Sequence, residues 1–237
     1  MRFTKYIVLL FFLIPHWAFS QLHLGIRGGY SISSIEFTPY QKERSLFDRV
    51  FDGGLVVKYF DLEYFGFQGE LNFTQRGYRL PIDEDILKKR INTYIETPIF
   101  MQIRFRQKGF FTHFNVGFYA SWLLKSAEGD NSSGAYDLSN YEFSLIKDNR
   151  VDYGLVGGLA LGYDSKWGTL QVEARFFYGL GDLYYYNYDG NPIRSPARVQ
   201  NLSLTYLYNI SSIRKSKKNP IDKLMRMNDP FDNINQE

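Results

Sequence analysis

The sequence predicts an all-β protein, an eight-stranded antiparallel up-and-down transmembrane β-barrel with short periplasmic turns and long extracellular loops. Three observations predict this fold. Segments of alternating apolar and polar residues recur along the chain, short and long gaps alternate between them, and aromatic residues make up 18% of the 237 residues. Aromatic side chains collect where a barrel wall meets the two membrane interfaces, so the composition agrees with the pattern.

The clearest alternation lies in the stretch GFQGELNFTQRGYRL. Phe67 and Leu71 fall on one face of this stretch, whereas Gln68 and Glu70 fall on the other. A repeat of two residues is the period of a β-strand and not of a helix. A chain of this length can close one barrel, so we expect one folded domain.

Seven further segments alternate in the same way, although the second segment is less regular. The eight predicted strands are, in order, Leu22–Ile32, Val50–Phe60, Gly66–Leu80, Ile95–Phe105, Phe111–Trp122, Val151–Tyr163, Thr169–Gly179 and Asn201–Ile210. Their apolar faces are formed, in the same order, by Leu24 and Ile26, Leu55 and Val57, Phe67 and Leu71, Ile99 and Met101, Phe114 and Val116, Leu159 and Leu161, Leu170 and Val172, and Leu202 and Leu204. Small residues on the opposite faces would leave room for large neighbours inside a narrow barrel.

The gaps between these strands alternate in length. The stretches DLEY, RQKG and DSKW form three short gaps, and the other gaps are longer and mostly polar. Bacterial outer-membrane barrels have short periplasmic turns and longer extracellular loops. We therefore expect the short gaps to lie in the periplasm, and an even number of strands then places both termini on that side.

The alternation alone leaves open which face is the interior. In a soluble lipocalin-like barrel, the alternative, the apolar faces would line a ligand cavity. Leu, Ile, Phe and Tyr from every strand would overfill eight strands, whereas Gly, Ser, Asn and a few charged residues fit the available space. This size argument favours a membrane barrel whose apolar faces contact lipid.

The N-terminal residues have the features of a signal peptide. Arg2 and Lys5 precede a short apolar run, and a small-x-small cleavage site ends at Ser20. The run is too short for a membrane span, which needs about 20 residues. We expect residues 1–20 to be a cleaved signal peptide and the mature protein to begin at Gln21, exported to a Gram-negative outer membrane.

The barrel is expected over residues 21–213, followed by a tail over residues 214–237. This tail is charged and interrupted by proline, a composition typical of disorder, and a periplasmic location follows from the predicted topology. Three apolar residues at helical spacing, Ile221, Leu224 and Met225, leave docking on a protein partner as the alternative.

Net charge and cysteine content argue against nucleic-acid binding, disulfide bonds and lipidation. The net charge of +3 comes from 28 Lys and Arg against 25 Asp and Glu, and two of the basic residues lie in the expected signal peptide. The mature chain is therefore close to neutral, which argues against nucleic-acid binding. The sequence contains no Cys, so it has neither disulfides nor a cysteine for lipidation.

Several stretches resemble the PorT-like family of small outer-membrane β-barrel proteins. They are LHLGIRGGYS, GFQGELNFTQRGY, YIETPIFMQIRF, VDYGLVGGLALGY, VEARFFYGLGDL and NLSLTYLYNI, and together they cover most of residues 22–210. The resemblance implies an eight-stranded barrel in a Gram-negative outer membrane, with no assigned activity for most members. The family's namesake is tied to a protein-secretion apparatus, so an accessory role in a secretion or envelope complex is a hypothesis.

The predicted inner faces carry charged residues of both signs. We expect seven of them to form a luminal charge network: Arg27, Glu70, Glu96, Arg104, Asp152, Glu173 and Arg175. A buried charge without a partner is strongly destabilising, so Arg104 and Arg175 should each reach a carboxylate. The interior of an eight-stranded barrel is just wide enough for side chains, and a packed network of this kind would close it to ions.

A catalytic alternative rests on His113, with Ser121 and Glu96 as its candidate partners in a base-activated serine site. The only other His in the expected mature chain is His23. We find no nucleophile motif, no metal-ligand spacing and no phosphate-binding loop, since GIRGGY lies within a predicted strand. We therefore expect no enzyme activity, no cofactor and no metal, and keep a lipid-modifying enzyme or a narrow pore as alternatives.

The stretch DLYYYNYDGNPIRSP is the most distinctive predicted loop. Tyr184, Tyr186 and Tyr188 alternate and, with Arg194 and Arg198, form a candidate extracellular contact for a glycan or a protein, because Tyr and Arg are favoured at interfaces. An aromatic girdle at the membrane interface is the alternative. The Asp-Gly pair in this stretch is a tight-turn signal, so we expect the last two strands to continue beyond the membrane as a hairpin.

A second loop, PIDEDILKKRI, is compatible with either a short helix or an extended hairpin. Taken together, these features predict a non-enzymatic outer-membrane barrel that acts as a structural or interaction component of the cell envelope. Its expected partners are the outer-membrane lipids and a protein bound through the extracellular loops or the tail.

Overall fold

A computed structural model of the chain describes residues 22–38, 44–45, 50–60, 62, 64–82, 86–144, 146–185 and 192–210. The expected signal peptide and tail lie outside the described residues, as do Tyr186 and Tyr188. Among the residues that are described, no helix is both long and apolar enough to cross a membrane.

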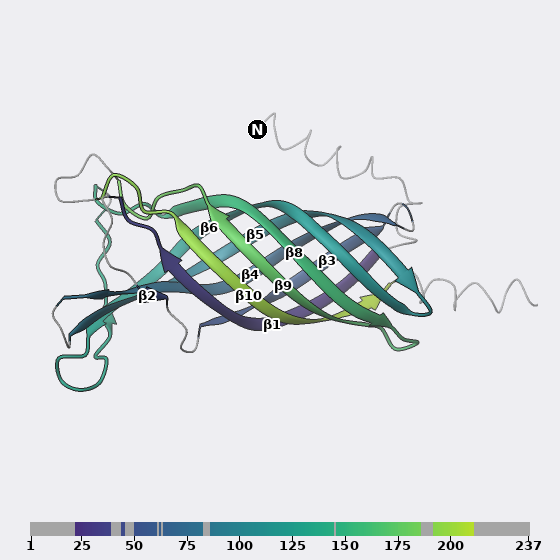
Figure 1. Ribbon diagram of the computed structural model, residues 1–237, viewed down its shortest axis with the longest axis horizontal. Coiled ribbons are helices and arrows are strands. Elements are labelled where there is room, and N and C mark those ends of the chain that lie inside the picture. Colours follow the sequence, from purple (N-terminus) through teal and green to yellow (C-terminus); the bar gives the residue numbers. More distant parts are fainter. Residues whose placement is uncertain are drawn as a thin grey trace, which may run out of the picture.

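Eight antiparallel strands form a closed ring, as predicted (Figure 1). In ring order they are β1 (Leu22–Ile35), β3 (Phe51–Phe60), β4 (Phe65–Pro81), β5 (Leu87–Gln107), β6 (Phe110–Asp130), β8 (Val151–Asp164), β9 (Thr169–Gly179) and β10 (Ala197–Asn209). The ring closes where β1 pairs with β10, in a register that runs from His23 opposite Asn209 to Ile35 opposite Ala197. Each predicted strand overlaps one strand of the ring, which confirms the all-β barrel fold.

The two ends of the barrel differ in their connections. At one end, the short-turn end, β3–β4, β5–β6 and β8–β9 are joined by the three short gaps identified in the sequence. The β5–β6 turn contains Lys108 with φ of 50° and Gly109 with φ of 88°, the two positive values that a type I′ hairpin turn requires. The longer connections all lie at the opposite end, the long-loop end (Figure 1).

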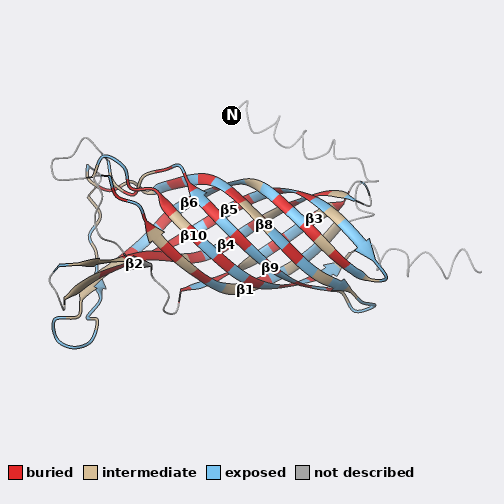
Figure 2. Ribbon diagram, in the orientation of Figure 1, coloured by how far each residue is buried: buried red, intermediate tan, exposed pale blue. Residues whose placement is uncertain are grey.

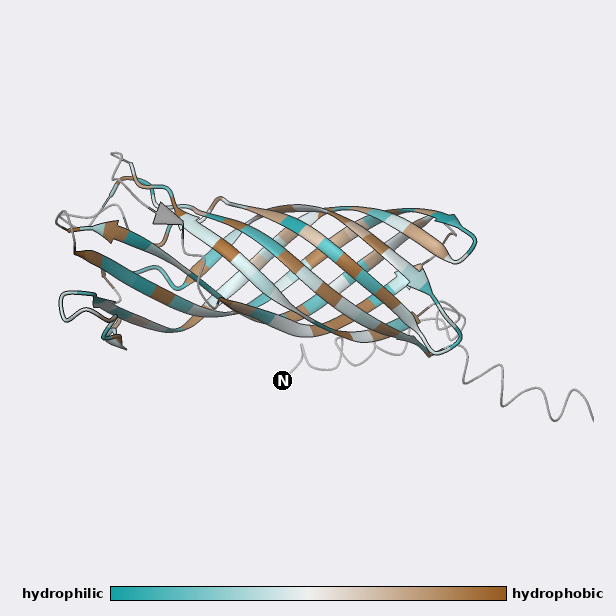
Figure 3. Ribbon diagram, turned by 60° about the horizontal axis from the view of Figure 1, so that its bottom comes forward, coloured by the Kyte–Doolittle hydropathy of each residue, from teal (hydrophilic) through white to brown (hydrophobic). Residues whose placement is uncertain are grey.

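The apolar residues face outwards and the polar residues face the lumen. Ile26 is 63% exposed, whereas its neighbour Arg27 is only 5% exposed. The same alternation follows each strand around the ring, so buried and exposed positions form a checkered wall (Figure 2). Hydropathy alternates along the strands in the same way (Figure 3). This inverted arrangement is that of a barrel whose outer wall contacts lipid.

Three neighbouring strands are much longer than a membrane requires. β4, β5 and β6 contain 17, 21 and 21 residues, whereas a transmembrane strand needs only about 9–11. Their ends extend past the ring at the long-loop end, where the two-residue strands β2 (Arg44–Ser45) and β7 (Ser139–Asn140) pair with β4 and β6 (Figure 1). A register shift between β5 and β6 at Thr93 and Tyr94 marks the start of this protruding sheet.

The loop predictions are borne out in part. The described residues of the stretch PIDEDILKKRI, 81–82 and 86–91, belong to the extended hairpin of β4 and β5, one of the two conformations expected for it. The hairpin expected between β9 and β10 is wrong over the described residues, because β9 ends at Gly179 and β10 begins only at Ala197. The intervening described segments instead fold over the barrel, held by the bridges of Thr38 to Arg194 and of Asp148 to Tyr184.

The outward assignment can be tested with a charged residue on the wall. Leu71 faces outwards on β4 between Phe67 and Phe73, so Leu71→Arg would place a cation among lipid chains. We expect a loss of about 2–4 kcal/mol in the free energy of unfolding, measured by urea titration in lipid vesicles. Ile82→Arg, at an exposed position on the protruding sheet, should change it by less than about 0.5 kcal/mol. Equal losses for the two variants would contradict the assignment.

Candidate functional site

The centre of the lumen is built around Arg175 on β9. Its Nη1 donates to Glu70 Oε2 at 2.7 Å and its Nη2 to Glu70 Oε1 at 2.6 Å, a two-pronged contact across the lumen to β4. Nη2 also lies 2.7 Å from Oε2 of Glu173 on the same strand. The three side chains are fully buried, and the Arg175 guanidinium stacks 4.6 Å from the centre of the Phe100 ring.

A second arginine extends this group towards β1 and β10. Arg27 Nη1 donates to Asp52 Oδ1 at 2.6 Å, and Arg27 Nη2 donates to Asn201 Oδ1 at 2.8 Å. The same Nη1 lies 3.6 Å from Glu70 Oε2, so Glu70 joins Arg27 to Arg175. The carboxylates are therefore shared between arginines and do not form isolated pairs.

Nearer the long-loop end, Arg76 on β4 joins two carboxylates. Its Nη1 donates to Asp152 Oδ2 at 2.5 Å and its Nη2 contacts Glu96. The Tyr119 hydroxyl donates to the same Asp152 oxygen at 3.2 Å, and the guanidinium lies 4.9 Å from the centre of the Tyr119 ring. A side chain at Gly154 would place a carbon 3.0 Å from this ring, so the glycine leaves the space that Tyr119 fills.

Towards the short-turn end the network becomes sparser. Lys58 donates to Gln171 Oε1 at 2.6 Å, and its Nζ lies 3.4 Å from Nδ1 of His113. Beyond them, Arg104 Nη2 donates to Asp164 Oδ2 at 2.5 Å.

The structure places all seven residues of the predicted luminal charge network inside the barrel. Four of them contact one another, because Glu70 pairs with Arg27 and Arg175, and Arg175 also pairs with Glu173. Glu96 and Asp152 are joined through Arg76, and Arg104 contacts Asp164, the last residue of β8. Sequence reasoning missed four members: Asp52, Lys58, Arg76 and Asp164. The first three stand at inward positions of predicted strands, so strict alternation was the signal that could have identified them.

Apolar side chains fill the space between the charged layers. A cluster of Phe100, Tyr119, Val156, Phe177 and Val199, all nearly fully buried, packs inside the ring. Charged groups of opposite sign therefore pair across the lumen while rings occupy its cross-section. Such an arrangement can hold the wall together and obstruct ions.

The catalytic hypothesis of a base-activated serine is not supported by the geometry. Ser121 donates to Glu96 at 3.3 Å, but His113 lies eight positions away on the same strand, roughly 27 Å at about 3.4 Å per residue. His113 stacks on Phe111 beside Lys58 instead. His23, the other histidine among the described residues, lies at the short-turn end. Among the described residues, no group of three His, Cys, Asp or Glu side chains could hold a metal ion.

The long-loop end is covered by a polar cluster centred on Arg90 of β5. Its Nη1 donates to the Tyr184 hydroxyl at 2.7 Å, its Nε to Ser126 at 2.9 Å, and its Nη2 lies 3.4 Å from Asp148. Burial alone would lower the pKa of Arg90, but the surrounding tyrosines, foremost Tyr184, and Asp148 raise it above its usual range. The guanidinium therefore stays charged and ties β5, β6 and two loops together.

Apolar residues complete this cover. Ile35, Phe37, Tyr78, Leu183 and Ala197 pack together above the lumen. Burial, together with the neighbouring Tyr184 hydroxyl 2.8 Å away, raises the pKa of Tyr78 well above its usual value, so the phenol stays neutral. We call the Arg90 cluster and these residues the lid.

The candidate extracellular contact differs from its expected form. Tyr184 belongs to the lid, half-buried with its hydroxyl engaged by Arg90, and is not part of an exposed row. Arg194 is exposed and pairs with Asp182 at 3.1 Å. Arg198 pairs with Glu36 at 2.7 Å and stacks 3.6 Å from the centre of the Tyr178 ring, a position typical of an interfacial girdle.

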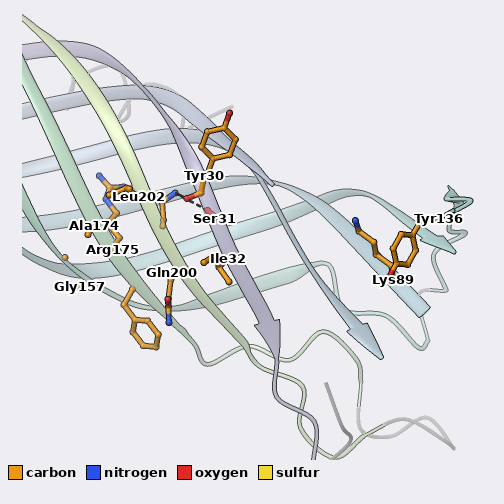
Figure 4. Close-up of a pocket in the computed structure, with 13 residues that line it drawn as sticks. Tyr30, Ser31, Ile32, Lys89, Tyr136, Gly157, Ala174, Arg175, Gln200 and Leu202 are labelled. Carbon is orange, nitrogen blue, oxygen red and sulfur yellow. Dashed lines mark hydrogen bonds between the residues drawn. The ribbon is translucent and has the colours of Figure 1, made fainter. Parts of the chain in front are cut away.

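The outer wall also carries an apolar groove of about 1220 Å³ (Figure 4). Gly157 and Ala174 leave it hollow between larger neighbours such as Tyr30 and Leu202, which point away from the lumen. Arg175 touches the groove only from behind and points into the barrel (Figure 4). The groove therefore belongs to the lipid-facing surface.

The importance of the central arginine can be measured. Arg175→Met would leave the Glu70 and Glu173 carboxylates buried without their main partner, and we expect the free energy of unfolding in urea to fall by about 3–5 kcal/mol. Arg194→Met, at an exposed ion pair, should lower it by at most about 1 kcal/mol. Adding Glu70→Gln and Glu173→Gln to Arg175→Met should recover part of the loss. If Arg175→Met left the free energy of unfolding unchanged, the contacts of Arg175 would not contribute to stability.

The chain is similar, at low sequence identity, to several solved structures. Ail, the attachment invasion locus protein of Yersinia pestis, is 16% identical, with 79% of this chain and 99% of that chain covered and a TM-score of 0.41. Neisserial surface protein A is 10% identical, with 80% and 97% covered and a TM-score of 0.40. OprG from Pseudomonas aeruginosa is 12% identical, with 80% and 97% covered and a TM-score of 0.43.

Comparison with curated protein sequences gives no match. The family model described as the outer membrane protein beta-barrel domain, in contrast, matches residues 17–185, most of the chain. The match covers seven of the eight strands of the ring and ends before β10. A β-barrel of the outer membrane is what this family description names, and the chain belongs to the outer membrane protein beta-barrel domain family.

Proposed function

We propose that this protein is a non-enzymatic, non-conducting component of the outer membrane that acts through contacts at its ends. The observation that carries the proposal is the filled lumen. Four basic and five acidic side chains from the strands are buried inside it, and aromatic rings occupy the spaces between them. An interior of this kind leaves neither a path for solutes nor a cleft for a substrate.

The long-loop end is the part we propose for presentation to partners. Orientation follows from the rule that long loops of bacterial outer-membrane barrels lie outside the cell. The lid fixes the bases of the loops, and the protruding sheet extends β4, β5 and β6 beyond the wall. Exposed apolar side chains such as Ile82, Ile146 and Ile193 stand on this end. A rigid platform with exposed apolar groups suits protein recognition, because less ordering is needed on binding.

The more specific role of this protein in the cell envelope is proposed from the sequence alone. The PorT-like resemblance supports an accessory subunit of a secretion or envelope complex. Export through a signal peptide cleaved before Gln21, and a second contact through the tail after residue 213, are parts of the same proposal. Neither a lipid-modifying enzyme nor a narrow pore is favoured by a specific contact in the lumen.

The closed lumen predicts an electrical result. Purified protein reconstituted in planar bilayers should give no steady ion conductance, because paired charges and packed rings occupy the cross-section. A porin preparation measured in the same bilayers serves as the positive control. Reproducible single-channel steps that depend on the amount of this protein would contradict the proposal.

The proposed orientation and partner can be tested in one experiment, since the chain contains no Cys. A single cysteine is introduced at Ile146 on the long-loop end or at Gln107 on the short-turn end, both exposed positions. A membrane-impermeant maleimide that carries a photo-crosslinker is added to intact cells. We expect labelling and a protein adduct for Ile146→Cys, and neither for Gln107→Cys. Labelling of Gln107→Cys alone would reverse the orientation, and a labelled Ile146→Cys without any adduct would argue against a protein partner.

A further inference from the structure

The mouth of the barrel at the short-turn end contains a pocket that the proposed function does not use. Its volume is about 440 Å³, within the range of about 300–1,000 Å³ typical of small-molecule sites. The lining combines basic side chains with aromatic and amide groups, and much of it comes from β5 and from the β8–β9 turn with the strand ends that flank it. The long-loop end differs from this open mouth, because the lid covers it.

Among the described residues that line this pocket, positive side chains outnumber negative ones. Arg104 and Arg106 stand two positions apart on the inner face of β5 and both contact Asp164 Oδ2, at 2.5 Å and 3.1 Å. Asp164 also accepts a hydrogen bond from the Thr169 hydroxyl at 2.5 Å. Lys166 lines the pocket as well, and no acidic side chain pairs with it in the described part of the chain. Among the described lining residues, three cations thus stand beside one carboxylate, so this part of the mouth is positive.

Arg104 and Arg106 differ in their contacts and in the exposure of their side chains. The Arg104 guanidinium lies 4.9 Å from the centre of the Phe60 ring and 4.5 Å from that of Phe111, and it is nearly buried. The Arg106 side chain is 44% exposed. A guanidinium has five N–H donors, and Asp164 contacts Arg106 through Nη2 only. Arg106 can therefore offer two parallel donors to an incoming carboxylate.

The β8–β9 turn presents an aromatic ring beside these cations. Trp167 is 84% exposed, yet its backbone is fixed: its N–H donates to Ser165 Oγ at 3.2 Å and its carbonyl accepts from the Tyr206 hydroxyl at 2.7 Å. Ser165 in turn bonds the Gly168 carbonyl. A pre-positioned ring needs little ordering when a ligand binds on it, and its face suits the apolar side of a sugar ring.

We propose that this pocket binds a small organic anion, specifically a carboxylate-bearing sugar. Arg106 and Lys166 would hold the carboxylate, Trp167 would cover the sugar ring, and the Asn209 amide at the rim would meet its hydroxyl groups. Asp164 keeps the two arginines in place and limits the total charge, so the site favours one anionic group. The assignment is independent of the role proposed for the long-loop end.

Titration calorimetry on the detergent-solubilised full chain tests the proposal. The probes are N-acetylmuramic acid, which has a carboxylate, N-acetylglucosamine, which shares the sugar without the acid, and inorganic phosphate. We expect binding of the acidic sugar that weakens as sodium chloride rises, and at least about tenfold weaker binding of the neutral sugar, as loss of a charge-assisted bond implies. Absence of binding of the acidic sugar, or equal binding of the neutral one, would overturn the proposal. Phosphate binding as tight as that of the acidic sugar would overturn the assignment to a sugar.

Matched variants separate the site from general charge effects. Arg106→Gln should weaken binding of the acidic sugar about tenfold, and Trp167→Ala should weaken it several-fold. Arg194→Gln is the control, because Arg194 is 52% exposed in its side chain and pairs with Asp182 at the same 3.1 Å, but at the other end of the barrel. All variants should keep the heat-dependent gel mobility of the folded barrel. Equal affinities for Arg106→Gln and Arg194→Gln would refute the site.

Discussion

The narrow lumen is the constraint on which the rest of this molecule depends. The outer wall must be apolar, so the polar side chain of every second residue is directed into a space that an eight-stranded ring leaves just wide enough for side chains. Charged groups there find their partners inside the lumen, in opposite charges and in polar side chains such as Asn201. Arg175 meets this constraint by contacting Glu70 and Glu173 together, and Arg27 continues the chain of contacts to Asp52.

Because the lumen is filled, binding surfaces for ligands or partners are available at the ends of the barrel. The two ends have different structures. The long-loop end is covered by the lid, where Arg90 ties strands and loops together, and the protruding sheet rises beside it. The short-turn end keeps a shallow open mouth, with Arg104 fixed between two aromatic rings. One end thus suits the display of a rigid surface, and the other suits a small ligand.

Much of the fold followed from a single period in the sequence. Alternation located all eight strands and separated lipid-facing residues such as Leu71 from luminal ones such as Glu70. It could not assign partners across the lumen, because those depend on how neighbouring strands are staggered around the ring. Arg104, for example, contacts Asp164 at the end of β8. Tyr184 was misplaced for a related reason, since only the folded loops bring its hydroxyl to Arg90. The long extension of β6 was missed, and that of β5 was only one of two conformations expected for PIDEDILKKRI, because polar stretches beyond the membrane carry no hydrophobic signal.

The seam between β1 and β10 has a consequence for how the barrel is made. Arg27 and Asn201, bonded across this seam, are separated by 174 positions in the sequence. Contacts between distant parts of a chain form slowly, because the entropy of closing the loop must be lost first. Until the first and last strands meet, the partners of Arg27 are incomplete and its charge faces an open half-barrel. Assembly should therefore be strongly cooperative, with partly closed intermediates too unstable to accumulate.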